Sequence, residues 1–146
     1  MRTAGSDRCA ETRTTQGSRP ATVLVVDDHA SVRETLCKLL ENTGYNVLRA
    51  RNGKEAMLVA REAENIDVLI TDLLMPDVDG LELMKMIRRT RPDIKILVIS
   101  GGGHISAPLC LTFARQLGAD IARAKPVKKE TLLRDVSALV AGCRSR

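Results

Sequence analysis

Apolar runs of strand length alternate with stretches of helical spacing five times along this chain of 146 residues. Continuous apolar strands that are joined through helices by short connections are typical of a parallel sheet covered on both faces. Right-handed crossovers then distribute the helices over the two sides of the sheet. The pattern therefore predicts an α/β fold with a doubly wound, five-stranded parallel sheet. The expected strands span residues 22–26, 46–50, 67–71, 95–99 and 121–124, and the expected helices span 31–42, 54–63, 81–89, 108–117 and 130–143.

The chain has the length of one domain, and its first 20 residues lack a periodic apolar pattern. We therefore predict a disordered N-terminal arm over 1–20, one domain over 21–143, and no output domain. Tyr45 and Phe113 are the only aromatic residues, and the net charge of +5 forms no basic stripe, so nucleic-acid binding is not favoured. No apolar run reaches membrane-spanning length, and we expect a cytoplasmic protein without a membrane partner.

Polar residues stand at the carboxyl ends of four expected strands. The first strand ends in Asp27 and Asp28, the third in Asp72, the fourth in Ser100 and the fifth in Lys125. These ends meet at one edge of a parallel sheet, where ligands bind in such folds. Two carboxylates at about 4 Å repel by about 4 kcal/mol at an effective dielectric near 20, so the cluster needs a cation. Carboxylate oxygens suit Mg²⁺, and the lysine adds a positive charge.

One use of such a set of side chains is phosphoryl transfer onto a carboxylate. Asp72 would be the nucleophile, while the metal and Lys125 would neutralise the transferring oxygens. Ser100 offers a hydroxyl that could donate a hydrogen bond to a phosphoryl oxygen after the transfer. Each of these residues has a common structural explanation when taken singly, but their joint placement at successive strand ends is specific.

Four sequence motifs carry a resemblance to a known family. They read Val-Val-Asp-Asp-His at 25–29, Asp-Leu-Leu-Met-Pro-Asp-Val-Asp-Gly at 72–80, Ile-Ser-Gly at 99–101, and Gly-Ala-Asp with Ala-Lys-Pro-Val between 118 and 127. With them the sequence resembles the receiver domain of bacterial two-component response regulators over about residues 21–143. The resemblance implies the strand order 2-1-3-4-5 in a flavodoxin-like, three-layer sandwich.

The resemblance also implies roles for individual residues. Asp72 would be the phospho-acceptor, Lys125 would contact the phosphoryl group, and Ser100 would be the switch hydroxyl. The implied ligands of Mg²⁺ are Asp27, Asp28, Asp72 and the backbone carbonyl of Leu74. Pro126 would follow a cis peptide bond. The implied phosphoryl donor is a sensor histidine kinase or a histidine phosphotransfer protein.

The sequence departs from the family pattern near the expected switch. Ala122 stands where the family usually has an aromatic residue, and Gly101 and Gly102 begin a loop unusually rich in glycine. We therefore expect phosphorylation to order this loop instead of rotating a ring, and to change the face formed by the fourth helix, fifth strand and fifth helix for a downstream protein. We expect His29 and His104 to be solvated side chains without a role.

Three functions fit these residues. The leading hypothesis is a stand-alone receiver that is phosphorylated on Asp72 and catalyses no reaction beyond its own phosphorylation and dephosphorylation. A non-phosphorylated pseudo-receiver, acting as an interaction module, is disfavoured because every required polar residue is present. An aspartate-nucleophile phosphatase also uses Asp and Mg²⁺, but such enzymes usually carry Asp-x-Asp on the first strand, whereas Asp27 and Asp28 are adjacent.

Overall fold

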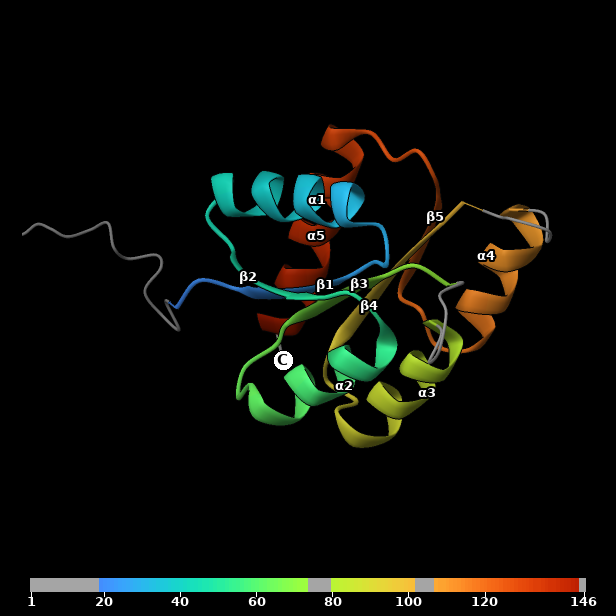
Figure 1. The fold of residues 1–146 in the computed structure, drawn as a ribbon, viewed down its shortest axis with the longest axis horizontal. Coiled ribbons are helices and arrows are strands. Elements are labelled where there is room, and N and C mark those ends of the chain that lie inside the picture. Colours follow the sequence, from blue (N-terminus) through green and yellow to red (C-terminus); the bar gives the residue numbers. More distant parts are fainter. Residues whose placement is uncertain (1–18, 74–79, 102–106, 145–146) are drawn as a thin grey trace, which may run out of the picture.

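The computed structural model describes residues 19–73, 80–101 and 107–144, and it shows one sheet between two layers of helices (Figure 1). The strands lie in the order β2-β1-β3-β4-β5, and every neighbouring pair is parallel. The strands are β1 (Thr22–Val26), β2 (Asn46–Ala50), β3 (Val68–Thr71), β4 (Lys95–Ser100) and β5 (Ile121–Ala124). The helices are α1 (Ala30–Asn42), α2 (Gly53–Glu62), α3 (Gly80–Thr90), α4 (Ala107–Gln116) and α5 (Lys129–Arg144). The predicted doubly wound, flavodoxin-like sandwich and its strand order are confirmed.

Each face of the sheet has its own hydrophobic core. Leu24 and Val26 of β1 belong to a buried cluster shared with α2, α3 and α4, whereas Val23 and Val25 belong to a second cluster shared with α1 and α5. Figure 1 shows α1 and α5 on one side of the sheet and α2 and α3 on the other. Successive side chains of a strand point to opposite faces, so a strand covered on both faces must be apolar throughout. This explains the unbroken apolar runs in the sequence.

The observed elements begin and end within one residue of the expected ranges. Gly44 and Gly118 follow α1 and α4 with φ of 106° and 110°. This left-handed backbone conformation is strained for residues with a side chain, and it commonly terminates helices. The two glycines therefore fix the lengths of α1 and α4.

The amino end of β3 is organised by the side chain of Asp67. Its carboxylate accepts hydrogen bonds from the Thr22 amide at 2.9 Å and from the Arg19 guanidinium at 3.0 and 3.1 Å. The strand begins at Val68, one residue later than expected. Arg19 falls within the predicted arm, yet it is held against the domain by this contact, and residues 1–18 lie outside the described part of the chain.

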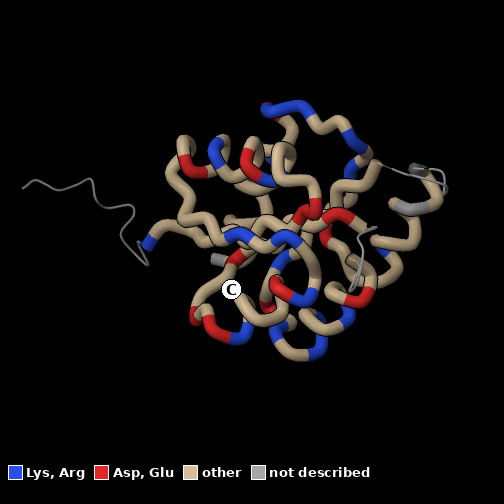
Figure 2. Tube along the Cα trace, viewed as in Figure 1, with Lys and Arg blue, Asp and Glu red and all other residues tan. Residues whose placement is uncertain are grey.

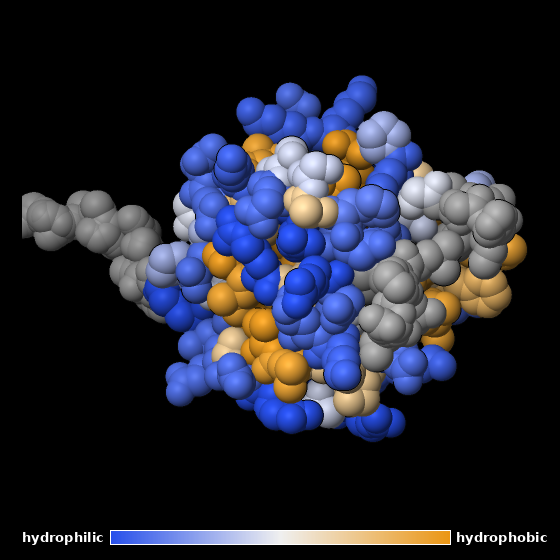
Figure 3. Space-filling view, viewed as in Figure 1, coloured by the Kyte–Doolittle hydropathy of each residue, from blue (hydrophilic) through white to orange (hydrophobic). Residues whose placement is uncertain are grey.

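The exposed surface is mainly polar on the face shown in Figure 3, with one group of hydrophobic residues at the α4 end of the molecule and another near α2. Leu109 and Phe113 of α4 are 49% and 46% exposed, and they lie four residues apart on one side of the helix. Among the described residues, no helix combines the length and hydropathy needed to cross a bilayer.

Candidate functional site

The adjacency of β1 and β3 brings two of the predicted acidic residues together. Val26 pairs with Thr71 in the parallel register, so Asp27 and Asp72 leave the sheet side by side at its carboxyl edge. Figure 2 shows acidic residues gathered at this edge. Asp27 is 3% exposed and Asp72 is 8% exposed. The expected convergence of carboxylates at one buried position is therefore present.

Lys125 follows β5 and reaches this acidic pair across β4. Its Nζ donates hydrogen bonds to Asp72 Oδ2 at 2.9 Å and to Asp27 Oδ2 at 3.1 Å. Its backbone N–H donates to the Ser100 carbonyl at 2.9 Å, which ties the residue to the end of β4. A Cβ at Gly101 would lie 3.7 Å from Lys125 Cδ, so the lysine stem runs beside this glycine. The peptide bond from Lys125 to Pro126 is cis.

The electrostatic balance of the site is negative. Burial by itself lowers the pKa of Lys125, but hydrogen bonds and charges of Asp72 and Asp27 outweigh it and raise that pKa above its ordinary value. The ammonium is therefore charged at neutral pH. Asp28 adjoins the pair as a third carboxylate, and its side chain is 27% exposed. One ammonium therefore does not balance the three negative charges. This donor set fits a hard divalent cation such as Mg²⁺.

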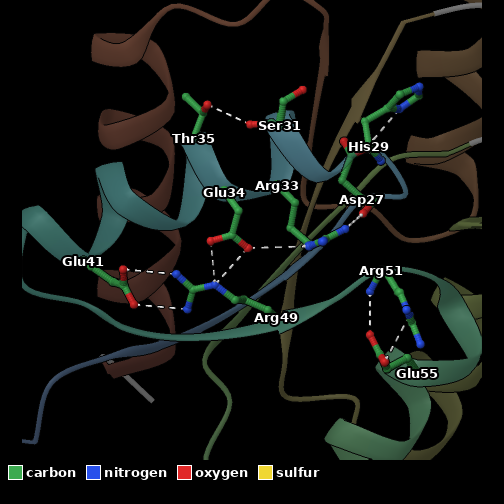
Figure 4. A network of polar contacts seen from close by, with 10 residues as sticks. All are labelled: Asp27, His29, Ser31, Arg33, Glu34, Thr35, Glu41, Arg49, Arg51 and Glu55. Atoms are coloured by element: carbon green, nitrogen blue, oxygen red, sulfur yellow. Dashed lines mark hydrogen bonds and ion pairs between the residues drawn. The ribbon is translucent and has the colours of Figure 1, made fainter.

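His29 and Arg33 also belong to this site. The His29 backbone N–H donates to Asp27 Oδ1 at 2.9 Å, and the Arg33 guanidinium donates to the Asp27 carbonyl at 2.9 Å (Figure 4). The His29 ring lies with Nδ1 3.4 Å from Asp27 Oδ1 and 3.3 Å from Asp28 Oδ1. The expectation that His29 is merely solvated was incomplete, since its side chain is 68% exposed and still contacts both carboxylates.

Two of the predicted switch residues lie on β4 and β5: Ser100 is the last residue of β4, and Ala122 lies within β5 opposite Val98. Ser100 is fully buried and pairs in register with Ala124. Ala122 is 2% exposed, and it shares a hydrophobic cluster with Ala114 of α4. Leu74, Gly102 and His104 lie outside the described residues.

Gly80 has a steric role that the sequence did not reveal. A Cβ at this position would lie 2.0 Å from the Asp72 carbonyl oxygen and 2.8 Å from Leu73 Cα. The Gly80 N–H also donates to the Leu73 carbonyl at 2.9 Å. The start of α3 thus packs directly on the backbone that presents Asp72. The Asp79-Gly80 pair indicated a turn in the sequence, but a turn signal carries no information about this contact.

A cavity of about 360 Å³ opens beside the acidic cluster. Ser31, Val32 and Thr35 of α1 line one side, and Pro126 and Val127 line the other. Asp27, Asp72 and Lys125 also border it. Asp72 can therefore be approached from this cavity, although this residue is almost completely buried.

Comparisons with known proteins place this geometry in a family. A family model described as the response regulator receiver domain matches residues 23–137. The response regulator MprA of Mycolicibacterium vanbaalenii is 37% identical over 122 residues, which are 83% of this chain and 51% of that protein. The CAI-1 autoinducer sensor kinase/phosphatase CqsS of Vibrio cholerae is 36% identical over 118 residues, which are 81% of this chain and 17% of that protein.

Solved structures agree with these relatives. The crystal structure of the Vibrio cholerae chemotaxis protein CheY4 is 31% identical and superposes with a TM-score of 0.73, covering 83% of this chain and 99% of that one. The chain spans about half the length of MprA and 17% of the length of CqsS. The family model nevertheless covers most of the chain and all five strands except the first residue of β1. The chain therefore belongs to the response regulator receiver domain family of two-component systems.

Proposed function

We propose that the chain accepts a phosphoryl group on Asp72, in a reaction that depends on Mg²⁺. The observation that carries this proposal is the bridge from Lys125 Nζ to both Asp72 and Asp27 at 2.9 and 3.1 Å. Receiver domains pair with histidine kinases or phosphotransfer proteins, so a phosphohistidine of such a partner is the donor. The phosphorus–nitrogen bond of the phosphohistidine breaks as a bond forms between phosphorus and an Asp72 carboxylate oxygen.

The surrounding residues would serve this transfer in distinct ways. Asp27, Asp28, Asp72 and the backbone carbonyl of Leu74 would hold the metal. When bound, Mg²⁺ supplies positive charge against the oxygens of the incoming phosphoryl group. Lys125, which is charged and already directed at Asp72, would bind one phosphoryl oxygen. The Ser100 hydroxyl would donate a hydrogen bond to another oxygen, and this contact would pull the end of β4 toward the site.

We infer that the signal leaves through the face formed by α4, β5 and α5. Ala122 has no ring that could swing inward, and it packs in a cluster that includes the small Ala114. Movement of Ser100 would instead act through the adjoining Gly101 on the start of α4. The exposed Leu109 and Phe113 of α4 would then be rearranged for a downstream protein.

Intact-mass analysis tests the phosphorylation directly. The wild-type chain is incubated with a small phospho-donor, such as acetyl phosphate, in Mg²⁺ or in excess chelator. We expect one added phosphoryl group with Mg²⁺ and none with chelator. Asp72→Asn should remain unlabelled, whereas Asp93→Asn, at an exposed position outside the site, should label like wild type. An unlabelled wild type would support the pseudo-receiver, and full labelling of Asp72→Asn would contradict the assignment.

Hydrogen exchange tests the output pathway. Beryllofluoride, a phosphoryl mimic, should increase amide protection over residues 101–111 if Ser100 orders the loop and the start of α4. Exchange that changes only on another face of the molecule would contradict this pathway without affecting the assignment of Asp72.

A further inference from the structure

We propose that His29 is a metal ligand through its ring Nδ1, and that it lets the acidic cluster bind borderline transition-metal ions such as Co²⁺, Ni²⁺ or Zn²⁺ as well as Mg²⁺. The inference deepens the proposed function, because it rests on Asp27 and Asp28 being the metal-binding carboxylates. It concerns which ions the site accepts.

The distances around His29 match those between ligands of one ion. Nδ1 lies 3.3 Å from Asp28 Oδ1 and 3.4 Å from Asp27 Oδ1. One donor atom from each of the three residues lies within 4.8 Å of the others. Ligands bound at about 2.1 Å from a tetrahedral or octahedral ion stand about 3.0–3.4 Å apart. The two nitrogen–oxygen contacts are therefore compatible with a shared ion.

The backbone holds the imidazole in this position. His29 is the N-cap residue of α1 in an extended conformation, with φ −91° and ψ 112°. An N-cap side chain usually accepts a hydrogen bond from the first turn of its helix, but the His29 side chain makes no such bond. Its ring is directed to Asp27 instead (Figure 4). The ring is thus available to a ligand that binds between it and the carboxylates.

The chemistry of the donor set then separates two classes of ion. Mg²⁺ prefers an all-oxygen environment and gains little from an imidazole. Co²⁺, Ni²⁺ and Zn²⁺ bind imidazole well, so a site with two carboxylates and one histidine favours them more than the carboxylates alone would. The exposed side of His29 also leaves space for water ligands. The competing explanation is a ring that only contacts the two carboxylates and binds no metal.

The small number of histidines makes a spectroscopic test possible. The chain contains two, His29 and His104. Co²⁺ is titrated at pH 7.5 into wild type, His29→Gln and the matched control His104→Gln, and hyperfine-shifted imidazole N–H signals are recorded by NMR. Wild type and His104→Gln should show one such signal, and His29→Gln should show none. Excess Mg²⁺ should displace the Co²⁺ and remove the signal.

Calorimetry supplies the affinities. The ratio of Co²⁺ to Mg²⁺ affinity should fall by at least about tenfold in His29→Gln. Loss of a residue that only supports a ligand already lowers metal affinity by about tenfold or more, and loss of a ligand should lower it at least as much. An unchanged ratio, or a shifted signal that survives in His29→Gln, would overturn the inference. Phosphorylation of wild type with Mg²⁺ is measured separately. Labelling without a His29 signal would refute this inference alone, and a His29 signal without labelling would refute the proposed function alone.

Discussion

Replacing Lys125 with Met should destabilise the metal-free protein, because it removes the ammonium and keeps most of the side-chain stem. The carboxylate oxygens of Asp27 and Asp72 that bind Nζ are 3.1 and 2.9 Å from it, and the two side chains are 4% and 9% exposed. These oxygens thus lie within about 6 Å of each other, where two unit charges repel by about 3 kcal/mol at an effective dielectric near 20.

The expected loss of unfolding free energy is about 2–3 kcal/mol. Removing one partner of a buried ion pair costs about 3–5 kcal/mol of stability. The Lys125 side chain is 25% exposed, so solvent screening should bring the loss to the lower end of this range or slightly below it. Urea unfolding at pH 7.5 with chelator measures the loss. Lys129→Met, at an exposed position in the first turn of α5, is the matched control and should change stability by no more than about 0.5 kcal/mol.

Metal and pH dependence should identify the cause of the loss. Added Mg²⁺ should stabilise Lys125→Met more than wild type, because it supplies the missing positive charge. The raised pKa of Lys125 means that its contribution is complete below the unfolded-state value of about 10.4 and is lost as pH rises through the folded-state value. The stability gap should therefore shrink above about pH 10.4. A variant as stable as wild type in chelator, or a gap that persists at high pH, would refute this reasoning.

Three further predictions address the rest of the site and the core. Gly80→Ala should lower the free energy of unfolding by at least about 2 kcal/mol, because its Cβ would lie 2.0 Å from the Asp72 carbonyl oxygen. The control in the same urea assay is Gly142→Ala, whose Cβ would lie 3.7 Å from its nearest neighbour. This control should be neutral or slightly stabilising. Asp28→Ala should abolish the rise in melting temperature with Mg²⁺, whereas wild type gains about 2.7 kcal/mol at a hundredfold excess over Kd; an equal rise in both would exclude Asp28 as a ligand. Burial raises the pKa of the Cys37 thiol to about 11. At pH 8 its alkylation by iodoacetamide should therefore be about a hundredfold slower than in denatured protein, and the rate should rise with pH. Equal alkylation rates in folded and denatured protein, measured by peptide mass mapping, would contradict its burial.

Much of the fold followed from periodicity. Apolar runs such as 22–26 indicated strands buried on both faces, and the intervening helical spacing indicated a parallel sheet with helices on its two sides. Helix ends were also predictable, since Gly44 and Gly118 are at positions of positive φ. The strand order could not be predicted in this way, because apolar periodicity does not say which strands are neighbours. It came from the family resemblance, and the structure confirmed it.

The chemistry of the candidate site was readable in part. The sequence placed Asp27, Asp28, Asp72, Ser100 and Lys125 at the ends of strands, because local patterns fix where a strand stops. It could not show that Lys125 reaches over β4 to touch both Asp27 and Asp72, since that distance depends on strand order and on the lysine rotamer.

The contacts of His29, Arg33 and Gly80 had no signature in the sequence. The His29 ring meets Asp27 and Asp28 because the N-cap conformation turns it toward them, and Arg33 reaches the Asp27 carbonyl from the first turn of α1. Gly80 is needed because α3 begins against the Asp72 carbonyl. Residue types and their spacing specify which groups stand at the edge of the sheet. Their distances and directions arise only when the strands pair and the helices pack, because packing brings together atoms from separate segments of the chain.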